Sequence, residues 1–340
     1  MSDRDGTREE ELLRAHLHRL VEDVEPRGDS LPRLLASVRR RRSPRRQLVL
    51  AAGAAVAATA VFLVALLAFP ENRGTEPASV EPNSYVAAPA PDSIAAFNVV
   101  TGQQLGRVAT LPGAPVGALA TDGERVFAIV AAGPRHQIVE SSPRGGQRVL
   151  AEVSPQANLL AAGGGRVAYA DRDAVVVRGA SERRLPVPAG EQVIDLALAA
   201  DGRLAVLTAA EGSRAGVIHL VAPEETSMAR VIDPHDDCGP LAVTWSGPEV
   251  AALRSAGCDT GRVRVATIDD RGRQIGAGLP FEAGRMDAHD VQLSTDRLGR
   301  FLVSVAGDRQ WLVDGSDVRQ VPPACAPEGG CAAVAATFWG

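Results

Sequence analysis

The chain has 340 residues and a formal net charge of −5, and its length allows about two domains. Residues 1–47 carry 12 Arg and 9 acidic residues, whereas residues 48–340 carry 24 Arg and 32 acidic residues, a net charge of −8 for the larger part. That acidic balance argues against nucleic acid as its partner. Every basic residue is arginine, and Gly, Ala and Pro are abundant, which is typical of a GC-rich bacterial genome.

The N-terminal 47 residues contain two predicted helices and a basic stretch. Thr7 and Glu10 have the spacing of a capping box, and apolar residues then recur at helical spacing, which predicts a helix over residues 8–25. Ser30 is the predicted N-cap of a second helix. Two short helices bury too little surface for a core of their own. They form either a cytosolic anchor that contacts anionic lipid or a docking element, within residues 8–42, that folds on a cytosolic protein.

Residues 48–69 form an uninterrupted apolar run, LVLAAGAAVAATAVFLVALLAF, whose 22 residues can span a bilayer as a helix. Six arginines lie among residues 39–46, on one side of this run only. The positive-inside rule therefore predicts a single-pass protein of the cell membrane, with a cytosolic N-terminus and residues 70–340 outside the cytosol. A cleaved signal peptide is the alternative, although its apolar core is about 7–15 residues long and follows a shorter basic region.

Five prolines lie between residues 70 and 92, together with Ala, Glu and Ser. This composition is typical of an extended spacer that continues to about residue 92. We assign residues 70–83 to the linker and residues 84–340 to an extracytoplasmic domain.

The outer domain repeats a unit of two β-rich runs joined by a tight glycine turn. Consecutive turn glycines are 41, 38, 45 and 52 residues apart, and further candidate hairpins follow, as at 136–153 and 262–279. Two hairpins in a period of about 40–50 residues predict a β-propeller with four strands per blade. Each unit thus has a first hairpin, which contains the glycine turn, and a second hairpin. The first hairpins are predicted at 117–130, 159–170, 196–208, 241–253 and 291–305, with turn glycines Gly123, Gly164, Gly202, Gly247 and Gly299.

The two ends of this domain are expected to complete a sixth blade. Residues 94–111 have the pattern of an outer hairpin alone, and residues 331–340 that of a lone inner strand, so their pairing would close the ring and remove an unpaired edge. By its repeat period and turn pattern, the region 84–340 resembles the TolB-type or YVTN-type six-bladed β-propellers, which implies an all-β outer domain. The GH…WD signature of WD-repeat propellers is absent. A pair of β-sandwiches is the alternative fold.

All four cysteines follow the predicted membrane span, and an even number on the oxidising side indicates two disulfides. Cys238 precedes a predicted hairpin and Cys258 follows it. Because the ends of a hairpin are close in space, a bond between these two is geometrically sensible. Cys325 and Cys331 would then join within the loop that leads to the last strand. Four cysteines allow three pairings, and their spacing alone does not choose between them.

The chain contains no GxSxG, HExxH, P-loop or CxxC motif, so we assign no catalytic residue and no cofactor, and we do not expect an enzyme. Two acidic loops, DPHDD at 233–237 and DAHD at 287–290, are expected to join neighbouring blades on one face. Histidine and carboxylate suit a divalent metal, whereas solvated polar loops are the alternative interpretation. The candidate ligand-site residues are His235, Asp236, Asp237, His289 and Asp290.

The sequence therefore favours a membrane-anchored, non-enzymatic binding or interaction module, with a protein or small ligand as partner on its outer face. The order of a short helical cytosolic segment, one span and an outer domain also resembles that of bacterial anti-sigma factors, which implies transmembrane signalling. The zinc-binding motif of those proteins, with its His and CxxC, is missing here. A metal-dependent hydrolase or lyase on a propeller scaffold is a further alternative, which would use His235 and His289.

Overall fold

A computed structural model describes residues 83–339, apart from residues 124, 144–145, 214–215, 229, 233–238, 259, 287, 290, 306–308, 323 and 325–335. The chain divides into two units, Met1–Asn72 and Arg73–Gly340, and every described residue belongs to the second. The predicted cytosolic helices, the predicted span at 48–69 and the linker at 70–83, except for its last residue, lie outside the described residues. Within the described part of the chain, no helix is long and apolar enough to cross a membrane.

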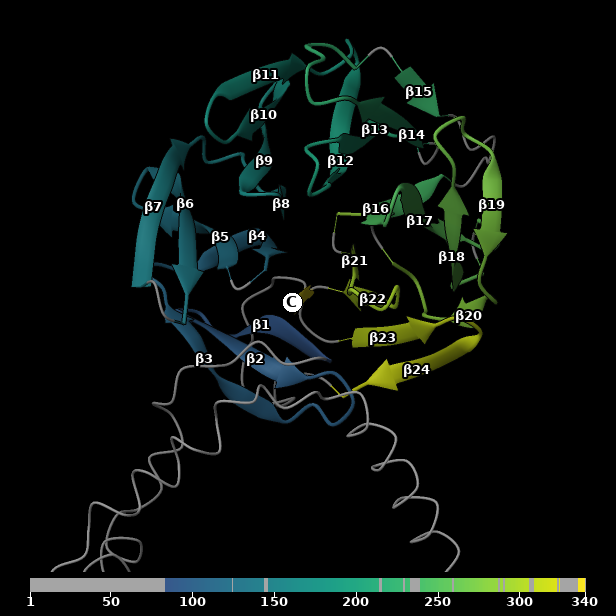
Figure 1. Cartoon of the computed structure of the whole chain (residues 1–340), viewed down its shortest axis with the longest axis horizontal. Helices are drawn as coiled ribbons and strands as arrows, with labels where there is room; N and C mark the ends of the chain where they lie inside the picture. Colours follow the sequence, from purple (N-terminus) through teal and green to yellow (C-terminus); the bar gives the residue numbers. More distant parts are fainter. Residues whose placement is uncertain are drawn as a thin grey trace, which may run out of the picture. The chain divides into compact units, whose positions relative to one another are not determined.

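The second unit is a ring of six antiparallel sheets, the blades of a β-propeller (Figure 1). In five blades the strands follow one another from the centre outwards, and we number these blades 1 to 5 in chain order. Their strands are β4 (Pro115–Asp122), β5 (Arg125–Ala132), β6 (Arg135–Ser142) and β7 (Gly146–Val153) in blade 1; β8 (Leu160–Gly163), β9 (Arg166–Asp171), β10 (Ala174–Arg178) and β11 (Glu182–Pro186) in blade 2; β12 (Glu191–Leu198), β13 (Leu204–Ala210), β14 (Gly216–Val221) and β15 (Arg230–Ile232) in blade 3; β16 (Pro240–Ser246), β17 (Glu249–Ser255), β18 (Arg262–Ile268) and β19 (Gln274–Ala277), with β20 (Phe281–Glu282) also paired to β18, in blade 4; and β21 (Val291–Thr295), β22 (Phe301–Val305), β23 (Arg309–Asp314) and β24 (Asp317–Val321) in blade 5.

Blade 6 joins the two ends of the domain. Its inner strand is β25 (Thr337–Trp339), followed outwards by β1 (Ser84–Ala90), β2 (Ser93–Asn98) and β3 (Gln104–Thr110). The C-terminal strand pairs antiparallel with β1, with Ser84 opposite Trp339. This pairing confirms the predicted closure of the ring by the C-terminus, and the six-bladed propeller replaces the alternative of two sandwiches.

The predicted extent of the spacer was wrong at its C-terminal end. Residues 84–90, SYVAAPA, form β1 rather than extended linker. The N-terminal end of the propeller domain therefore supplies three strands to blade 6 and not a single hairpin. The ladder between β1 and β2 is irregular between Ala87 and Ala90. Pro89 lies at this irregularity, where a residue without an N–H is tolerated in a sheet. The assigned domain start at Ser84 coincides with the first residue of β1.

The predicted first hairpins correspond to β4–β5, β8–β9, β12–β13, β16–β17 and β21–β22. Gly164 shows why one of their turns requires glycine. Its φ is +57°, and a Cβ there would lie 1.9 Å from the carbonyl oxygen of Ala200 in the turn of the next blade. A side chain at residue 164 would therefore force neighbouring blades apart at their inner ends.

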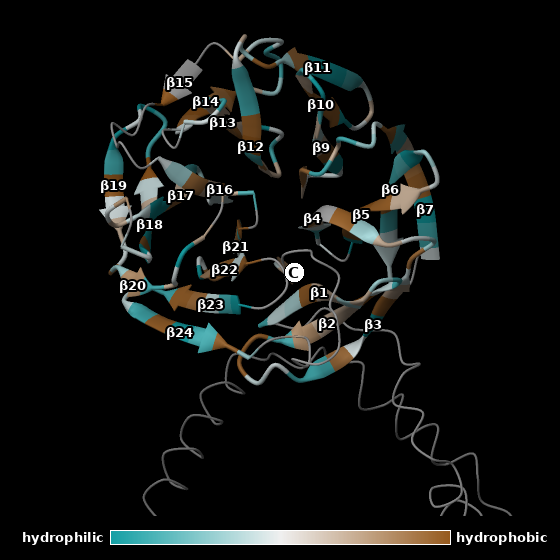
Figure 2. Cartoon of the chain, turned by 180° about the vertical axis from the view of Figure 1, so that it is seen from behind, coloured by the Kyte–Doolittle hydropathy of each residue, from teal (hydrophilic) through white to brown (hydrophobic). Residues whose placement is uncertain are grey.

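Hydrophobic side chains fill the spaces between neighbouring blades. Tyr85 of β1 belongs to a cluster with Leu302 and Leu312 of blade 5, whereas the next residue, Val86, clusters with Leu119 of blade 1. Successive side chains of a strand point to opposite faces, so the middle strands are buried on both sides. The outer strands β7 and β24 are mostly exposed, and Figure 2 shows hydrophilic and hydrophobic colours alternating along them.

Candidate functional site

The inner strands of all six blades surround a central cavity of about 490 Å³, which we call the central well. Its lining lies near the ends of the inner strands that lead into the hairpin turns, such as Asp122 and Gly123 after β4. Among the described strands, each inner strand has only one neighbour in its sheet, so its inward edge is not paired to another described strand. A volume of this size is within the range of small-molecule sites in proteins.

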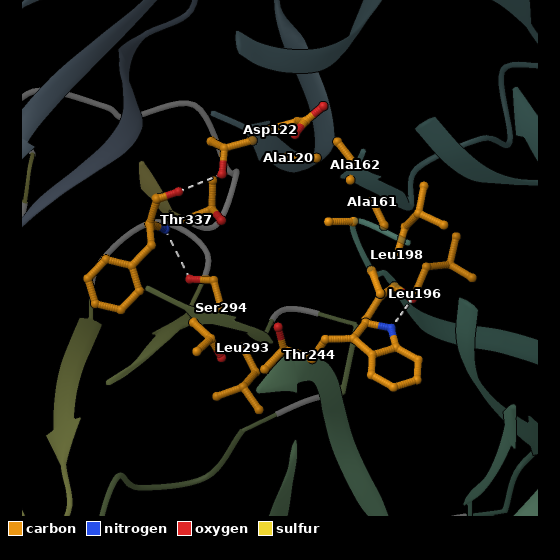
Figure 3. A pocket seen from close by; sticks show the side chains of 18 of the residues that line it. Ala120, Asp122, Ala161, Ala162, Leu196, Leu198, Thr244, Leu293, Ser294 and Thr337 are labelled. Atoms are coloured by element: carbon orange, nitrogen blue, oxygen red, sulfur yellow. Dashed lines mark hydrogen bonds between the residues drawn. The ribbon is translucent and has the colours of Figure 1, made fainter. Parts of the chain in front are cut away.

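Side chains bind the unpaired backbone groups where β4, β21 and β25 meet. The Thr121 hydroxyl donates to the carbonyl oxygen of Phe338 at 2.7 Å, and the Phe338 amide donates to the Ser294 hydroxyl at 3.0 Å (Figure 3). The Gln292 amide group donates to the carbonyl oxygen of Leu119 at 2.7 Å. These three bonds fix the C-terminal strand and its neighbours in blades 1 and 5 as one wall of the well.

Two further bonds join β12 to β16 on another side of the well. The indole N–H of Trp245 donates to the carbonyl oxygen of Ala197 at 3.0 Å. The carboxylate of Asp195 accepts from the amide of Val243 at 2.7 Å and from the amide of Leu196 at 2.8 Å. Burial raises the pKa of Asp195 to about 7, against the opposing effect of these two amides. Asp195 is therefore a titratable link between the inner strands of blades 3 and 4.

The wall of the well differs from one side to the other (Figure 3). Hydroxyl groups come from blades 1, 4, 5 and 6, whereas blades 2 and 3 contribute only aliphatic residues and glycine to the described lining. Ala120, Val243 and Leu293 add aliphatic groups on the hydroxyl side. The one carboxylate among the described lining residues, Asp122, accepts from Arg125 and from the amide of Gly165, so its charge is compensated. The hydroxyl residues are Thr121, Thr244, Ser294, Thr295 and Thr337, and the aliphatic ones on blades 2 and 3 are Leu160, Ala161, Ala162, Leu196, Ala197, Leu198, Ala199 and Ala200.

The predicted cation-site residues are almost all outside the described residues. His235, Asp236, Asp237 and Asp290 are among those not described, and His289 is exposed in the turn before β21. The predicted convergence of the two loops therefore stays a prediction. Within the described ranges, no group of three or more His, Cys, Asp or Glu side chains could hold a metal ion.

Of the four cysteines in the predicted disulfides, Cys258 alone is among the described residues. Cys258 follows β17, is exposed, and is disulfide-bonded. Cys238, Cys325 and Cys331 lie outside the described residues. The partner of Cys258 is therefore not identified, and the Cys238–Cys258 pairing stays a prediction.

Sequence reasoning did not find the central well. Its lining consists of Ala, Leu, Ser and Thr residues that form no local motif and come from strands far apart in the chain. The predicted repeat was the one sequence feature that could have indicated the well, because the first strand of each propeller unit borders the central channel.

Comparison with known families gives one partial match. Residues 126–179 match the model of the FbpC C-terminal regulatory nucleotide binding domain. This segment runs from β5 of blade 1 to just beyond β10 of blade 2, so it covers parts of two blades and about a sixth of the chain. No curated protein matches the chain. The match concerns neither the TolB-type nor the YVTN-type propellers, so that finer assignment and the anti-sigma-like layout are not confirmed.

Proposed function

We propose that the chain is a membrane-anchored, extracytoplasmic β-propeller that binds a small ligand without a positive charge in its central well and acts as a binding module rather than an enzyme. The observation that carries this proposal is the division of the well into a hydroxyl side and an aliphatic side. Such a wall suits a ligand with hydrogen-bonding groups on one face and apolar groups on the other. A cationic ligand would lose its hydration there without finding an uncompensated carboxylate, since the Asp122 carboxylate is already bonded and the remaining charged side chain of the described lining, Arg297, is itself positive.

Thr244 and Thr337 provide the test of ligand binding. Each lines the well, and replacement by valine removes one hydroxyl while it keeps the β-branched shape. With the blocked dipeptide N-acetyl-alanyl-alanine amide as probe, we expect Thr244→Val and Thr337→Val each to weaken binding about fivefold, the effect of one hydrogen bond. Isothermal titration calorimetry on the purified full-length chain measures this.

The matched control for this test is Thr267→Val, on β18 of blade 4 and not part of the well. It should leave the affinity unchanged. No binding of the blocked dipeptide at millimolar concentration, or equal loss in all three variants, would remove the central well as the ligand site. Tighter binding of the same dipeptide with a free, protonated N-terminal amine would contradict a ligand without a positive charge.

The anchoring part of the proposal rests on the apolar run 48–69 and the arginines among residues 39–46. It places the propeller outside the cytosol, with the lipid bilayer as one partner and a protein or small ligand as another. Protease added to intact cells should digest the propeller and leave an epitope tag ahead of residue 1 protected. Detergent-lysed cells are the control, since both parts should then be cleaved. A propeller that stays protected in intact cells would overturn this topology.

A second candidate is a transmembrane signalling protein of the anti-sigma-factor type. The order of predicted cytosolic helices, one span and an outer domain favours it. In this candidate, residues 8–42 bind a cytosolic partner and the TolB-type or YVTN-type propeller outside is the sensor. Recovery of a sigma factor on an affinity column that carries residues 1–47, and not on a column that carries the same residues in scrambled order, would support it. If the column that carries residues 1–47 recovers no sigma factor, the signalling candidate is contradicted and the binding module remains the proposed function.

A further inference from the structure

A second cavity, the arginine groove, lies between blades 1 and 2 and has a volume of about 290 Å³. Three arginines and one glutamate provide its charged lining, and the three arginines come from three different strands, β5, β7 and β10. The charges of the described lining residues therefore sum to +2. The charged residues are Arg125, Glu140, Arg148 and Arg178, and the rest of the lining is Phe127, Val149, Leu150, Gly165, Val167 and Gly179.

Each arginine of the groove has a carboxylate partner, but two of these carboxylates are not part of the lining. Arg125 bonds Asp122, and Arg178 bonds Glu182 at 3.4 Å, whereas Arg148 bonds Glu140 at 2.8 Å inside the groove. Each of these pairs uses a single guanidinium nitrogen. A guanidinium carries five N–H donors in a planar fork, so donors remain for another acceptor.

The exposure of these side chains indicates which pairs an incoming anion can disturb. The Arg148 side chain is 68% exposed and the Arg178 side chain is 44% exposed. Exposed ion pairs contribute only about 0–1 kcal/mol, because water screens them and long side chains must be ordered. An anion that bonds two guanidinium groups at once can therefore compete with the present partners of Arg148 and Arg178.

We propose that the arginine groove binds a small phosphate-bearing molecule through its phosphate. The planar fork of arginine matches phosphate oxygens in a bidentate manner, and charge-assisted bonds of this kind are among the strongest hydrogen bonds in proteins. Gly165 leaves room at one end of the groove. A Cβ at this residue would lie 3.8 Å from a terminal guanidinium nitrogen of Arg125, so a larger side chain would reach the space in front of that arginine.

The groove recognises the phosphate and not an attached base. Among the described lining residues, Phe127 is the one aromatic side chain, and it is 1% exposed. The guanidinium carbon of Arg125 lies over its ring, 5.6 Å from the ring centroid. Phe127 offers no free face on which a base could stack. Inorganic pyrophosphate and adenosine diphosphate should therefore bind with dissociation constants within about threefold of each other, and adenosine should not bind.

The test measures binding of pyrophosphate, adenosine diphosphate and adenosine to the purified full-length chain by isothermal titration calorimetry at low salt. Arg148→Gln and Arg178→Gln should each weaken pyrophosphate binding at least about tenfold, because each removes a charge-assisted contact. Glu140→Gln should tighten it severalfold, since it removes the one negative charge among the described residues of the lining and releases Arg148. A rise in ionic strength should weaken binding in the unaltered chain.

Arg135→Gln is the matched control. Arg135 is 69% exposed, lies on β6 of blade 1, and is paired with Glu152 at 3.2 Å outside the groove. It should leave the affinity unchanged, and melting curves of all variants should show intact folding. Absence of pyrophosphate binding at millimolar concentration, or an equal loss with Arg135→Gln, would overturn the proposal. Much tighter binding of adenosine diphosphate than of pyrophosphate would overturn recognition by phosphate alone. These results are independent of the central well.

Discussion

Truncation of the chain at Pro323 should abolish cooperative folding of the propeller, although β25 is the only described strand that it removes. β25 is the inner strand of blade 6, and its residues Phe338 and Trp339 are 3% and 2% exposed. Phe338 packs in the cluster between blades 5 and 6, and Trp339 packs in the cluster between blades 6 and 1. The truncation therefore removes contacts on both sides of the closing blade.

The magnitude follows from the side chains that are lost. Loss of one buried Phe or Trp side chain costs about 3–5 kcal/mol. The loss of both is comparable with the whole free energy of unfolding of a domain, about 5–15 kcal/mol. The truncation also removes the acceptor of the Ser84 hydroxyl, the carbonyl oxygen of Trp339 at 3.1 Å. It leaves the edge of β1 unpaired, and an apolar strand edge promotes aggregation.

Melting curves and size-exclusion chromatography measure this effect. The truncated chain should show no cooperative transition or should elute as an aggregate. Deletion of residues 70–82 is the control and should leave the transition unchanged, because β1 starts only at Ser84. If the Pro323 truncation melted like the complete chain, ring closure by β25 would not be a source of stability.

The sequence predicted the ring because its information is local and repeated. A tight glycine turn between two apolar β-rich runs defines each first hairpin, and five such hairpins at similar spacing indicate a propeller. The C-terminal run could be assigned to the inner position because 94–111 lacked a first hairpin. β1 was missed because Pro89 and the alanines of residues 84–90 have the composition of a spacer, and only pairing with Trp339 reveals a strand.

The candidate sites could not be predicted in the same way. The groove combines Arg125, Arg148 and Arg178, which lie on different strands and belong to no motif. The central well is formed by residue types that any strand contains. Asp195 did carry a local signal, since it is the one charged residue in the apolar run VIDLAL, 193–198. A carboxylate at such a position is either paired with donors or strongly perturbed.

The stability of the propeller should fall as the pH rises from about 4 to about 7, owing to Asp195. Burial raises its pKa from 3.8 to about 7 in the folded chain. Between these values the unfolded chain has already released the proton and the folded chain still holds it. Because the unfolded state then binds fewer protons, the free energy of unfolding decreases with pH. The whole contribution is about 4 kcal/mol, from 1.36 kcal/mol for each unit of the pKa difference.

Asp195→Asn isolates this contribution, since asparagine does not titrate. Its single side-chain oxygen can satisfy only one of the amides of Leu196 and Val243, so the variant loses about 1–3 kcal/mol at every pH. The diagnostic quantity is therefore the slope and not the absolute stability. Urea unfolding at several pH values should show the unaltered chain losing stability relative to Asp195→Asn between pH 4 and pH 7.

Asp269→Asn is the control with the opposite sign. The amide of Arg273 has the largest effect and lowers the pKa of Asp269, desolvation opposes it, and the guanidinium of Arg273 and the amide of Arg271 lower the pKa further. The unaltered chain should therefore lose stability relative to Asp269→Asn as the pH falls through the pKa of Asp269. Parallel pH profiles for the unaltered chain and Asp195→Asn would show that Asp195 ionises without cost, as a carboxylate held by its two amides. A difference that grows above pH 4 and levels off above pH 7 would identify Asp195 as a carboxyl group that the fold keeps protonated up to neutral pH, because its ionisation buries a charge between the inner strands of blades 3 and 4.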